Sequence, residues 1–133
     1  MFVDASAIVA ILNGEPEADA FADAIEASGA AVTSPIAIFE AGLALCRTRH
    51  TAVEDATADV EEFLNVAGIQ CLPITRNEAR TALAAYARYG KGRGHPAQLN
   101  LGDCFAYAMA RNQGVPLLFK GDDFIKTDIE PAA

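Results

Sequence analysis

The sequence predicts an α/β domain in which helices cover both faces of a central, mainly parallel sheet. Short apolar runs alternate along the chain with longer segments of helical spacing, as in sheets whose strands are joined by helical crossovers. The chain has 133 residues, which is the size of one domain and is enough to bury a core. We therefore expect residues 1–133 to form a single domain.

Four apolar runs are predicted to form the strands of the sheet. They are 1–3 (MFV), 30–34 (AAVTS), 69–74 (IQCLPI) and 115–119 (VPLLF). Right-handed crossovers bring the carboxyl ends of parallel strands to one edge of a sheet. Functional groups of α/β proteins gather beyond that edge, so residues that follow these runs are candidates for a site.

The segments between these runs have the apolar spacing of amphipathic helices. The clearest terminal signal is Thr75 followed by Glu78, which predicts a capping box at a helix start. In the helix expected over 51–68, the acids should face water while Val53, Val60 and Leu64 are buried. The predicted helices cover 5–14, 15–28, 35–49, 51–68, 75–90 and 102–114, and 91–100 is expected to be a polar, glycine-rich loop.

The chain is acidic, with a formal charge of −8 and a pI of about 4.6. An acidic surface repels phosphate backbones at long range, so the overall charge argues against a nucleic-acid partner. A local basic patch or a bound cation can reverse the sign at one site.

The three cysteines, Cys46, Cys71 and Cys104, are too far apart in sequence for a metal-type spacing, and each has apolar neighbours. We expect them to be reduced core residues of a cytosolic protein. The first residues have no basic region and include Asp4, so no signal peptide is expected. No apolar run approaches the roughly 18 residues of a membrane span.

Three acids follow predicted strands. Asp4 follows the first strand, and Asp122 and Asp123 follow the last. Each could be an ordinary solvated loop acid. Because parallel strands end at one edge, we expect Asp4 to face other acids there.

Glu40 lies on a helix face that should be buried, because Ile36, Ala37, Leu43 and Ala44 are its helical neighbours. A lone buried carboxylate is costly unless it is paired, protonated or bound to a metal. An ion pair with a core arginine or a neutral acid would also satisfy this position.

Asp103 begins a helix, where an aspartate ordinarily caps the helix and suits its dipole. Four separate elements nevertheless each deliver an acid, and carboxylates a few ångströms apart repel by several kcal/mol at an effective dielectric of about 20. A divalent cation removes this repulsion. Oxygen ligands without nearby His or Cys suit Mg²⁺ or Mn²⁺ better than zinc.

Four stretches resemble the PIN domain, specifically the VapC-type toxin ribonucleases. They are VDAS at the start, PIAIFEAGLAL with Glu40, LNLGDCFAYAMA with Asp103, and PLLFKGDDF near the end. The resemblance spans nearly the whole chain. It implies a three-layer α/β/α PIN-like fold, Mg²⁺ or Mn²⁺ on four acids, and cleavage of RNA phosphodiester bonds. Ser6 matches a family hydroxyl that supports the first acid by hydrogen bonding.

The resemblance implies that Asp4, Glu40 and Asp103 are three of these acids. Asp122 lies closer to the last strand, whereas Asp123 matches the family's DF ending, and we favour Asp123 as the fourth. The implied mechanism has Asp4 and Asp103 binding the metal. Glu40 and the fourth acid then hold its waters or a second metal, and a metal-activated water attacks the phosphodiester.

Two basic clusters are candidates for contact with RNA phosphates. Lys91 and Arg93 lie in the glycine-rich loop, and Arg47 lies at a helix end, where cations also suit the dipole. We expect phosphate contact more from the loop than from the helix end. His50 and His95 have no nearby acid–base partner and are left out of the catalytic set.

Two other readings remain open at this point. A receiver-like phosphoacceptor signalling domain has a similar length, acids after the first strand and a lysine after the last, here Lys120. A receiver-like domain also requires an aspartate at the end of a central strand, and the run IQCLPI has none. The second alternative is a catalytically silent interaction module whose acids only cap helices.

The resemblance also implies partners. It implies a homodimer, and a small antitoxin protein that inserts a segment into the acidic groove to form a toxin–antitoxin heterocomplex. A basic side chain entering the carboxylate cluster would displace the metal. The RNA target is not encoded in any motif, because target choice depends on pocket shape and contacts to splayed bases.

Overall fold

The computed structural model describes all residues, 1–133, and has a central four-stranded sheet in which every pairing is parallel. The strand order is β3-β2-β1-β4. The strands are β1 (Phe2–Val3), β2 (Val32–Thr33), β3 (Gln70–Cys71) and β4 (Leu117–Leu118). In register, Phe2 is opposite both Val32 and Leu117. The predicted parallel sheet is therefore confirmed, and β1 lies inside it.

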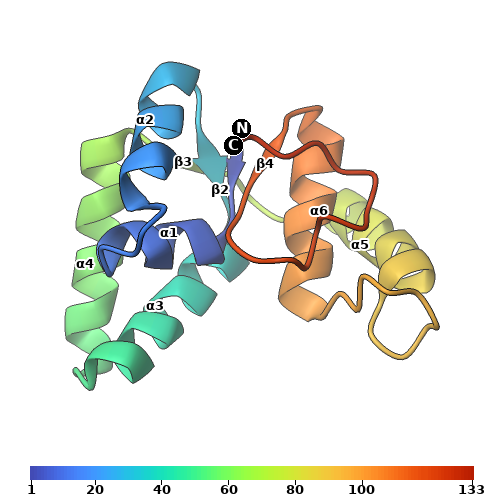
Figure 1. Cartoon of the computed structure of the whole chain (residues 1–133), viewed down its shortest axis with the longest axis horizontal. Helices are drawn as coiled ribbons and strands as arrows, with labels where there is room; N and C mark the ends of the chain where they lie inside the picture. Colours follow the sequence, from blue (N-terminus) through green and yellow to red (C-terminus); the bar gives the residue numbers. More distant parts are fainter.

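Six helices cover the sheet, and Figure 1 shows α1 to α4 on one side of it and α5 and α6 on the other. This is the predicted three-layer arrangement. The helices are α1 (Ala5–Leu12), α2 (Ala18–Ser28), α3 (Pro35–Arg49), α4 (Val53–Ala67), α5 (Arg76–Tyr89) and α6 (Leu101–Gln113). None of them is long and apolar enough to cross a membrane.

Several element ends differ from the prediction. The strands are shorter than the apolar runs because only two residues of each run enter the ladder. Helix α2 begins at Ala18 rather than at residue 15, because Glu15 and Pro16 lie in the turn that follows α1. The capping box at α5 is confirmed: the Thr75 N–H donates to Glu78 Oε1 over 2.9 Å.

The buried core lies between the sheet and both helical layers, and it includes the four residues of β1 and β4. Two predictions about burial are wrong. Val53 is 59% exposed, because it is the first residue of α4 and the buried stripe of this helix begins one turn later at Ala56. Cys71 is exposed because β3 is an edge strand, whereas Cys104 is buried.

The chain ends beside β4. Leu117 donates its N–H to the Glu130 carbonyl and accepts from Ala132 N–H through its own carbonyl. The Tyr107 hydroxyl donates to Asp128 Oδ1 over 2.5 Å, which ties this tail to α6. The tail and the segment after β4 are therefore fixed to the sheet and to α6.

Candidate active site

Asp4 stands at the carboxyl end of β1, in the middle of the sheet, and is buried. It is the N-cap of α1, and its Oδ2 accepts from the Ser6 N–H (3.1 Å) and from the Ser6 hydroxyl (2.6 Å). The Ser6 hydroxyl oxygen also accepts from the backbone N–H of Lys120 over 3.0 Å. One serine thus joins the first acid to the segment that follows β4.

Glu40 lies on α3 and faces the first turn of α6. A Cβ atom added to Gly102 would lie 2.0 Å from Glu40 Oε2, so the carboxylate occupies space that only a glycine leaves open. The side chain is half-buried rather than fully buried. It forms neither the ion pair with a core arginine that its helix face allowed nor any hydrogen bond.

Asp103 has the ordinary capping role as well as a place beside the other acids. Its backbone N–H donates to Asn100 Oδ1 (2.9 Å), and its Oδ2 accepts from the Asn100 N–H (3.1 Å). This second capping box begins α6 at Leu101, one residue earlier than predicted. The box fixes one carboxylate oxygen of Asp103 at the helix start.

The structure distinguishes the two acids after β4. Burial raises the pKa values of both Asp4 and Asp103, and Asp123 is the acid of this segment whose negative charge adds to the rise. Both side chains are exposed, but Phe124 beside Asp123 is buried and stacks edge-on with Phe119. Asp123 is therefore the acid of this segment that lies within electrostatic range of the others.

The four candidate acids have no positively charged side chain beside them to balance their negative charges. Burial raises the pKa of Asp4 against the hydrogen bonds from Ser6, and it also raises the pKa of Glu40, with the charge of Asp4 adding to the effect. Burial raises the pKa of Asp103 to about 7, and the charges of Asp123, Asp4 and Glu40 add to this rise. None of the four acids forms an ion pair.

This donor set fits a hard divalent cation in its chemistry, because it offers only carboxylate oxygens and has no cation of its own to balance them. The side chains do not stand in a ready-made metal site: no three Asp, Glu, His or Cys side chains are grouped closely enough to hold an ion. The oxygens that Asp4 and Asp103 turn toward Ser6 and Asn100 are already engaged. Their other oxygens and the unbonded Glu40 carboxylate are the atoms available to a cation.

The PIN domain family matches residues 1–130 of this chain. Ribonuclease VapC28 of Mycobacterium tuberculosis is 42% identical over 132 residues, which is 99% of this chain and 97% of that protein. Ribonuclease VapC42 of the same species is 43% identical over 133 residues, with 99% and 98% covered. The chain belongs to the PIN-domain family of VapC ribonucleases.

Further comparisons agree with this family. VapC ribonuclease R02377 of Rhizobium meliloti is 42% identical over 139 residues, covering 96% of this chain and 98% of that protein. The crystal structure of M. tuberculosis VapC20, described as a toxin that cleaves the sarcin-ricin loop, superposes with a TM-score of 0.72. The superposition covers 96% of this chain and 95% of the VapC20 chain, and the two sequences are 16% identical. This similarity supports the fold alone.

The receiver-like alternative is not favoured. In this VapC-family domain β3 ends at Cys71 and is an edge strand, so no central strand delivers the additional aspartate that a phosphoacceptor needs. Lys120 forms ion pairs with Glu15 and Glu17. It does not pair with any acid of the site.

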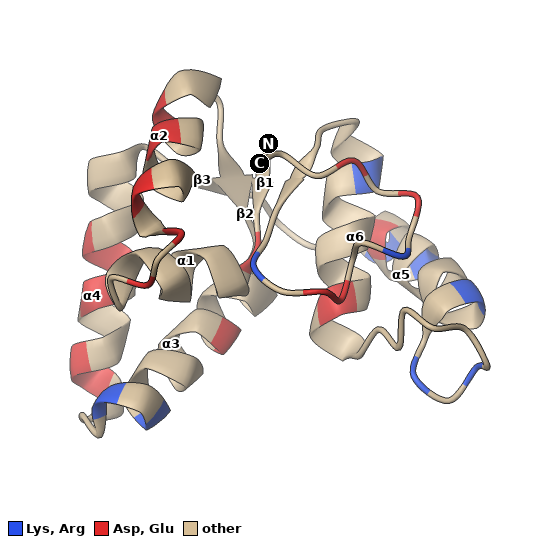
Figure 2. Ribbon diagram, viewed as in Figure 1, with Lys and Arg blue, Asp and Glu red and all other residues tan.

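The predicted basic residues do not form one patch. Lys91 and Arg93 are exposed on the loop between α5 and α6, whereas Arg47 lies near the end of α3, and Figure 2 shows these two places at opposite ends of the molecule. Both histidines have structural roles. His50 is the C-cap of α3, and His95 Nδ1 accepts from the Ala97 N–H over 3.0 Å.

Sequence reasoning missed two contributors to this site. Asn100 fixes Asp103 through the capping box, and Gly102 makes room for Glu40. The Asn100-to-Asp103 spacing was a usable signal, because Asn followed three residues later by an acid resembles a capping box. Nothing in the local sequence indicates why residue 102 is glycine. The requirement comes from the Glu40 side chain, which is distant in the sequence and occupies the space of a Cβ atom at this position.

Proposed function

We propose that this VapC-family domain is a divalent-metal-dependent endoribonuclease and the toxin of a type II toxin–antitoxin pair. The observation that carries the proposal is the set of four carboxylates without a cationic partner, in which burial and the charge of another acid of the set raise the pKa values of Asp4, Glu40 and Asp103. Relatives that are more than 40% identical over nearly the whole chain are named ribonucleases, which supports RNA as the substrate.

In this proposal Asp4 and Asp103 hold Mg²⁺ or Mn²⁺, and Glu40 and Asp123 hold its waters or a second ion. When bound, such an ion polarises a water for attack on phosphorus and neutralises charge that develops on the phosphate. Ser6 orients Asp4 through two hydrogen bonds to one oxygen. Glu40 forms no hydrogen bond within the protein. Its carboxylate can therefore accept a hydrogen bond from a reacting water.

The charge distribution favours one side of the molecule for the RNA. Residues 1–75 hold two Lys or Arg against twelve Asp or Glu, whereas residues 76–133 hold eight against six. The second stretch forms α5, the loop with Lys91 and Arg93, α6, β4 and the tail, and Figure 2 shows most of its basic positions around α5, α6 and that loop. We place the RNA strand across this side, with Lys91 and Arg93 on phosphates and Arg47 too distant to share them. The salt dependence of RNA affinity measures these contacts.

Removal of divalent ions tests the central claim. Purified wild-type protein is expected to cleave total cellular RNA at discrete positions in Mg²⁺ or Mn²⁺ and to stop when EDTA is in excess. Re-addition of Mg²⁺ should restore the same cleavage sites, which distinguishes the protein from a contaminating metal-independent nuclease. Cleavage that persists unchanged in EDTA would refute the metal-dependent mechanism.

The antitoxin is proposed to act on the same carboxylates. A basic side chain from its segment would neutralise the four unpaired acids and take the place of the cation. The antitoxin is then expected to lose inhibition, while still binding, when that one basic residue is replaced by Gln. Inhibition that survives the replacement would place its action elsewhere.

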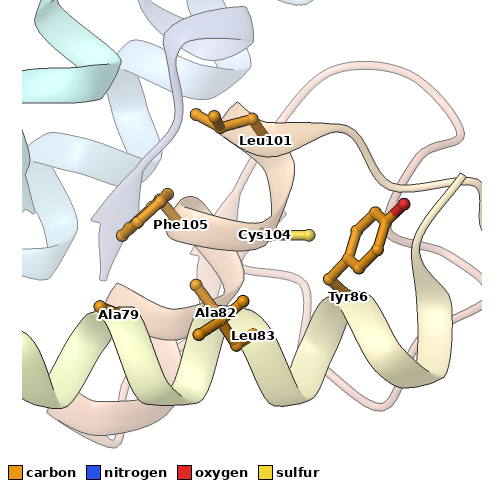
Figure 3. A pocket seen from close by; sticks show the side chains of 7 residues that line it. All are labelled: Ala79, Ala82, Leu83, Tyr86, Leu101, Cys104 and Phe105. Atoms are coloured by element: carbon orange, nitrogen blue, oxygen red, sulfur yellow. The ribbon is translucent and has the colours of Figure 1, made fainter.

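The homodimer is proposed to form across an apolar groove between α5 and α6. Figure 3 shows the groove, which has a volume of about 420 Å³ and is lined only by apolar or aromatic side chains. Leu83 and Leu101 border it and are each 68% exposed. A protruding apolar side chain beside an apolar groove on one surface is what a two-fold contact between identical copies requires.

Light scattering measures the oligomeric state of the protein directly. Wild-type protein is expected at twice its 14.0 kDa chain mass, and Leu83→Glu at the mass of one chain, because the new charge would be buried in the contact. Val66→Glu is a matched control, since Val66 is 82% exposed on α4 away from the groove. A Leu83→Glu protein that stays dimeric would move the interface to another face.

A further inference from the structure

The segment after β4, which carries Asp123, is held to the body of the protein by Lys120. The backbone N–H of Lys120 donates to the Ser6 hydroxyl, and that hydroxyl donates to Asp4. The Lys120 ammonium group points to a different place. It forms ion pairs with Glu15 Oε1 and, over 3.0 Å, with Glu17 Oε2.

The two acids that receive this lysine are built into a rigid turn. Pro16 lies between them, and its ring fixes the backbone that separates Glu15 from Glu17. The turn is anchored on both sides: the Glu15 N–H donates to the Ala10 carbonyl, and the Ala18 N–H donates to the Glu15 carbonyl, both over 2.9 Å. The backbone that carries both acceptors is therefore fixed by bonds that do not involve Lys120.

The contact also satisfies an otherwise isolated oxygen. Glu17 Oε2 is shielded from water and has no hydrogen-bonding partner of good geometry, so the ammonium group of Lys120 is its only compensation. The side chains of Lys120, Glu15 and Glu17 are each about one-third exposed. The two ion pairs are therefore partly buried and not fully solvated. Contacts of the Lys120 ammonium group with the accepting carboxylates of Glu15 first, and then of Glu17, raise the pKa of Lys120, so the amine stays charged.

Without Glu15 and Glu17, we expect the site acids to attract Lys120, because Asp123 is three residues further along the chain and Asp4 is reached through Ser6. Lys120 starts one hydroxyl group away from Asp4, and its flexible four-carbon stem would let the ammonium group turn toward them. A lysine among these carboxylates would neutralise them, as a metal does. The arrangement seen keeps Lys120 out of the site.

We propose that Glu15 and Glu17 are positioning residues that clamp Lys120, fixing the segment that carries Asp123 and keeping an internal cation out of the metal site. The proposal rests on the proposed metal-dependent function. Glu15 and Glu17 touch neither substrate nor metal and act only through Lys120. Phe124, which is buried, anchors the other side of Asp123.

Mn²⁺ binding to the purified chain, followed by electron paramagnetic resonance without RNA, tests the clamp. E15Q/E17Q is expected to raise the Kd for Mn²⁺ by about 10-fold, as is typical when a group that supports metal ligands is lost. Adding K120M to this double variant should recover most of the loss, because the freed lysine is then absent. E54Q/E62Q removes the same charge from exposed positions of α4 and should bind like wild type.

Two outcomes would overturn the exclusion of Lys120 from the metal site: E15Q/E17Q binding Mn²⁺ as wild type does, or the triple variant binding as weakly as the double. Hydrogen exchange of the backbone amides of 119–124 provides a metal-independent measurement. Faster exchange there in K120M than in wild type supports the clamp, and unchanged exchange contradicts it. If wild type itself binds no Mn²⁺, the proposed function fails, while hydrogen exchange still decides whether Lys120 fixes the segment.

Discussion

Asp4→Asn is expected to lower the rate of metal-dependent RNA cleavage by roughly 1,000-fold or more, because an ion that stabilises transition-state charge contributes several kcal/mol and each 1.36 kcal/mol is tenfold in rate. Asp4 lies at the end of an inner strand, and its charge adds to the burial that raises the pKa values of Glu40 and Asp103. An amide at this position keeps the shape but loses the negative charge that is proposed to hold the cation.

The fold of Asp4→Asn should remain intact. Asparagine is as good an N-cap as aspartate, so the hydrogen bond from the Ser6 N–H is retained. Burial raises the pKa of Asp4, which means that the charged form is disfavoured in the folded protein and a neutral side chain relieves that cost. Thermal unfolding of the variant without metal is therefore expected at or above the wild-type temperature.

Asp122→Asn is the matched control, because it makes the same chemical change next to the proposed fourth acid. It should cleave RNA at nearly the wild-type rate, since Asp123 is the acid of this segment whose charge adds to the raised pKa values of Asp4 and Asp103. A folded Asp4→Asn protein with full activity would end the proposed mechanism. A loss in Asp122→Asn as large as that in Asp4→Asn would instead show that the fourth acid has been chosen wrongly.

The sequence was sufficient to predict the layers and the parallel sheet, and it indicated three candidate site acids, for definite physical reasons. Alternation of strands and helices leaves few topologies, and strand ends in such a sheet meet at one edge. Glu40 was identifiable because its helical neighbours are apolar, although it proves half-buried. Asp103 was identifiable only in combination, since its capping role alone explains an acid at a helix start.

The remaining features depend on contacts that local pattern does not encode. Asp122 and Asp123 are adjacent, and only the course of the chain after Gly121, whose φ of +103° suits glycine, decides which one faces the other acids. The exposure of Val53 and Cys71 depends on where neighbouring elements stop. The pairing of Lys120 with Glu15 and Glu17 joins residues about a hundred positions apart, and no local periodicity predicts it.

Metal-free protein is expected to lose stability as the pH rises from about 4 to about 8. The pKa of Asp103 is 3.8 without perturbation and about 7 in the folded protein. Between these values the folded state retains a proton that the unfolded chain has released. The folded state then binds more protons than the unfolded state, so the free energy of unfolding falls as pH rises. The contribution is fully present below about pH 4 and is lost above about pH 7.

The size of this loss is on the order of 1–2 kcal/mol for Asp103 after allowance for solvent screening, and the raised pKa values of Asp4 and Glu40 act in the same direction. The lowered pKa values of Glu78 and Asp128 act in the opposite direction, because they add stability as pH rises. Their effect is complete once both groups are ionised in the unfolded chain, at about pH 5. The window from pH 5 to pH 8 therefore reports on the site acids.

Urea unfolding in EDTA at pH 5 and pH 8 measures this difference, and Asp103→Asn should make it smaller. Mg²⁺ should reverse the trend, because a cation binds the ionised carboxylates and stabilises the folded state more at pH 8 than at pH 5. A wild-type protein whose metal-free stability is equal at the two pH values, or higher at pH 8, would show that these acids do not repel one another. The reason for expecting a cation among them would then be gone, since only their mutual repulsion and burial make the ion favourable there.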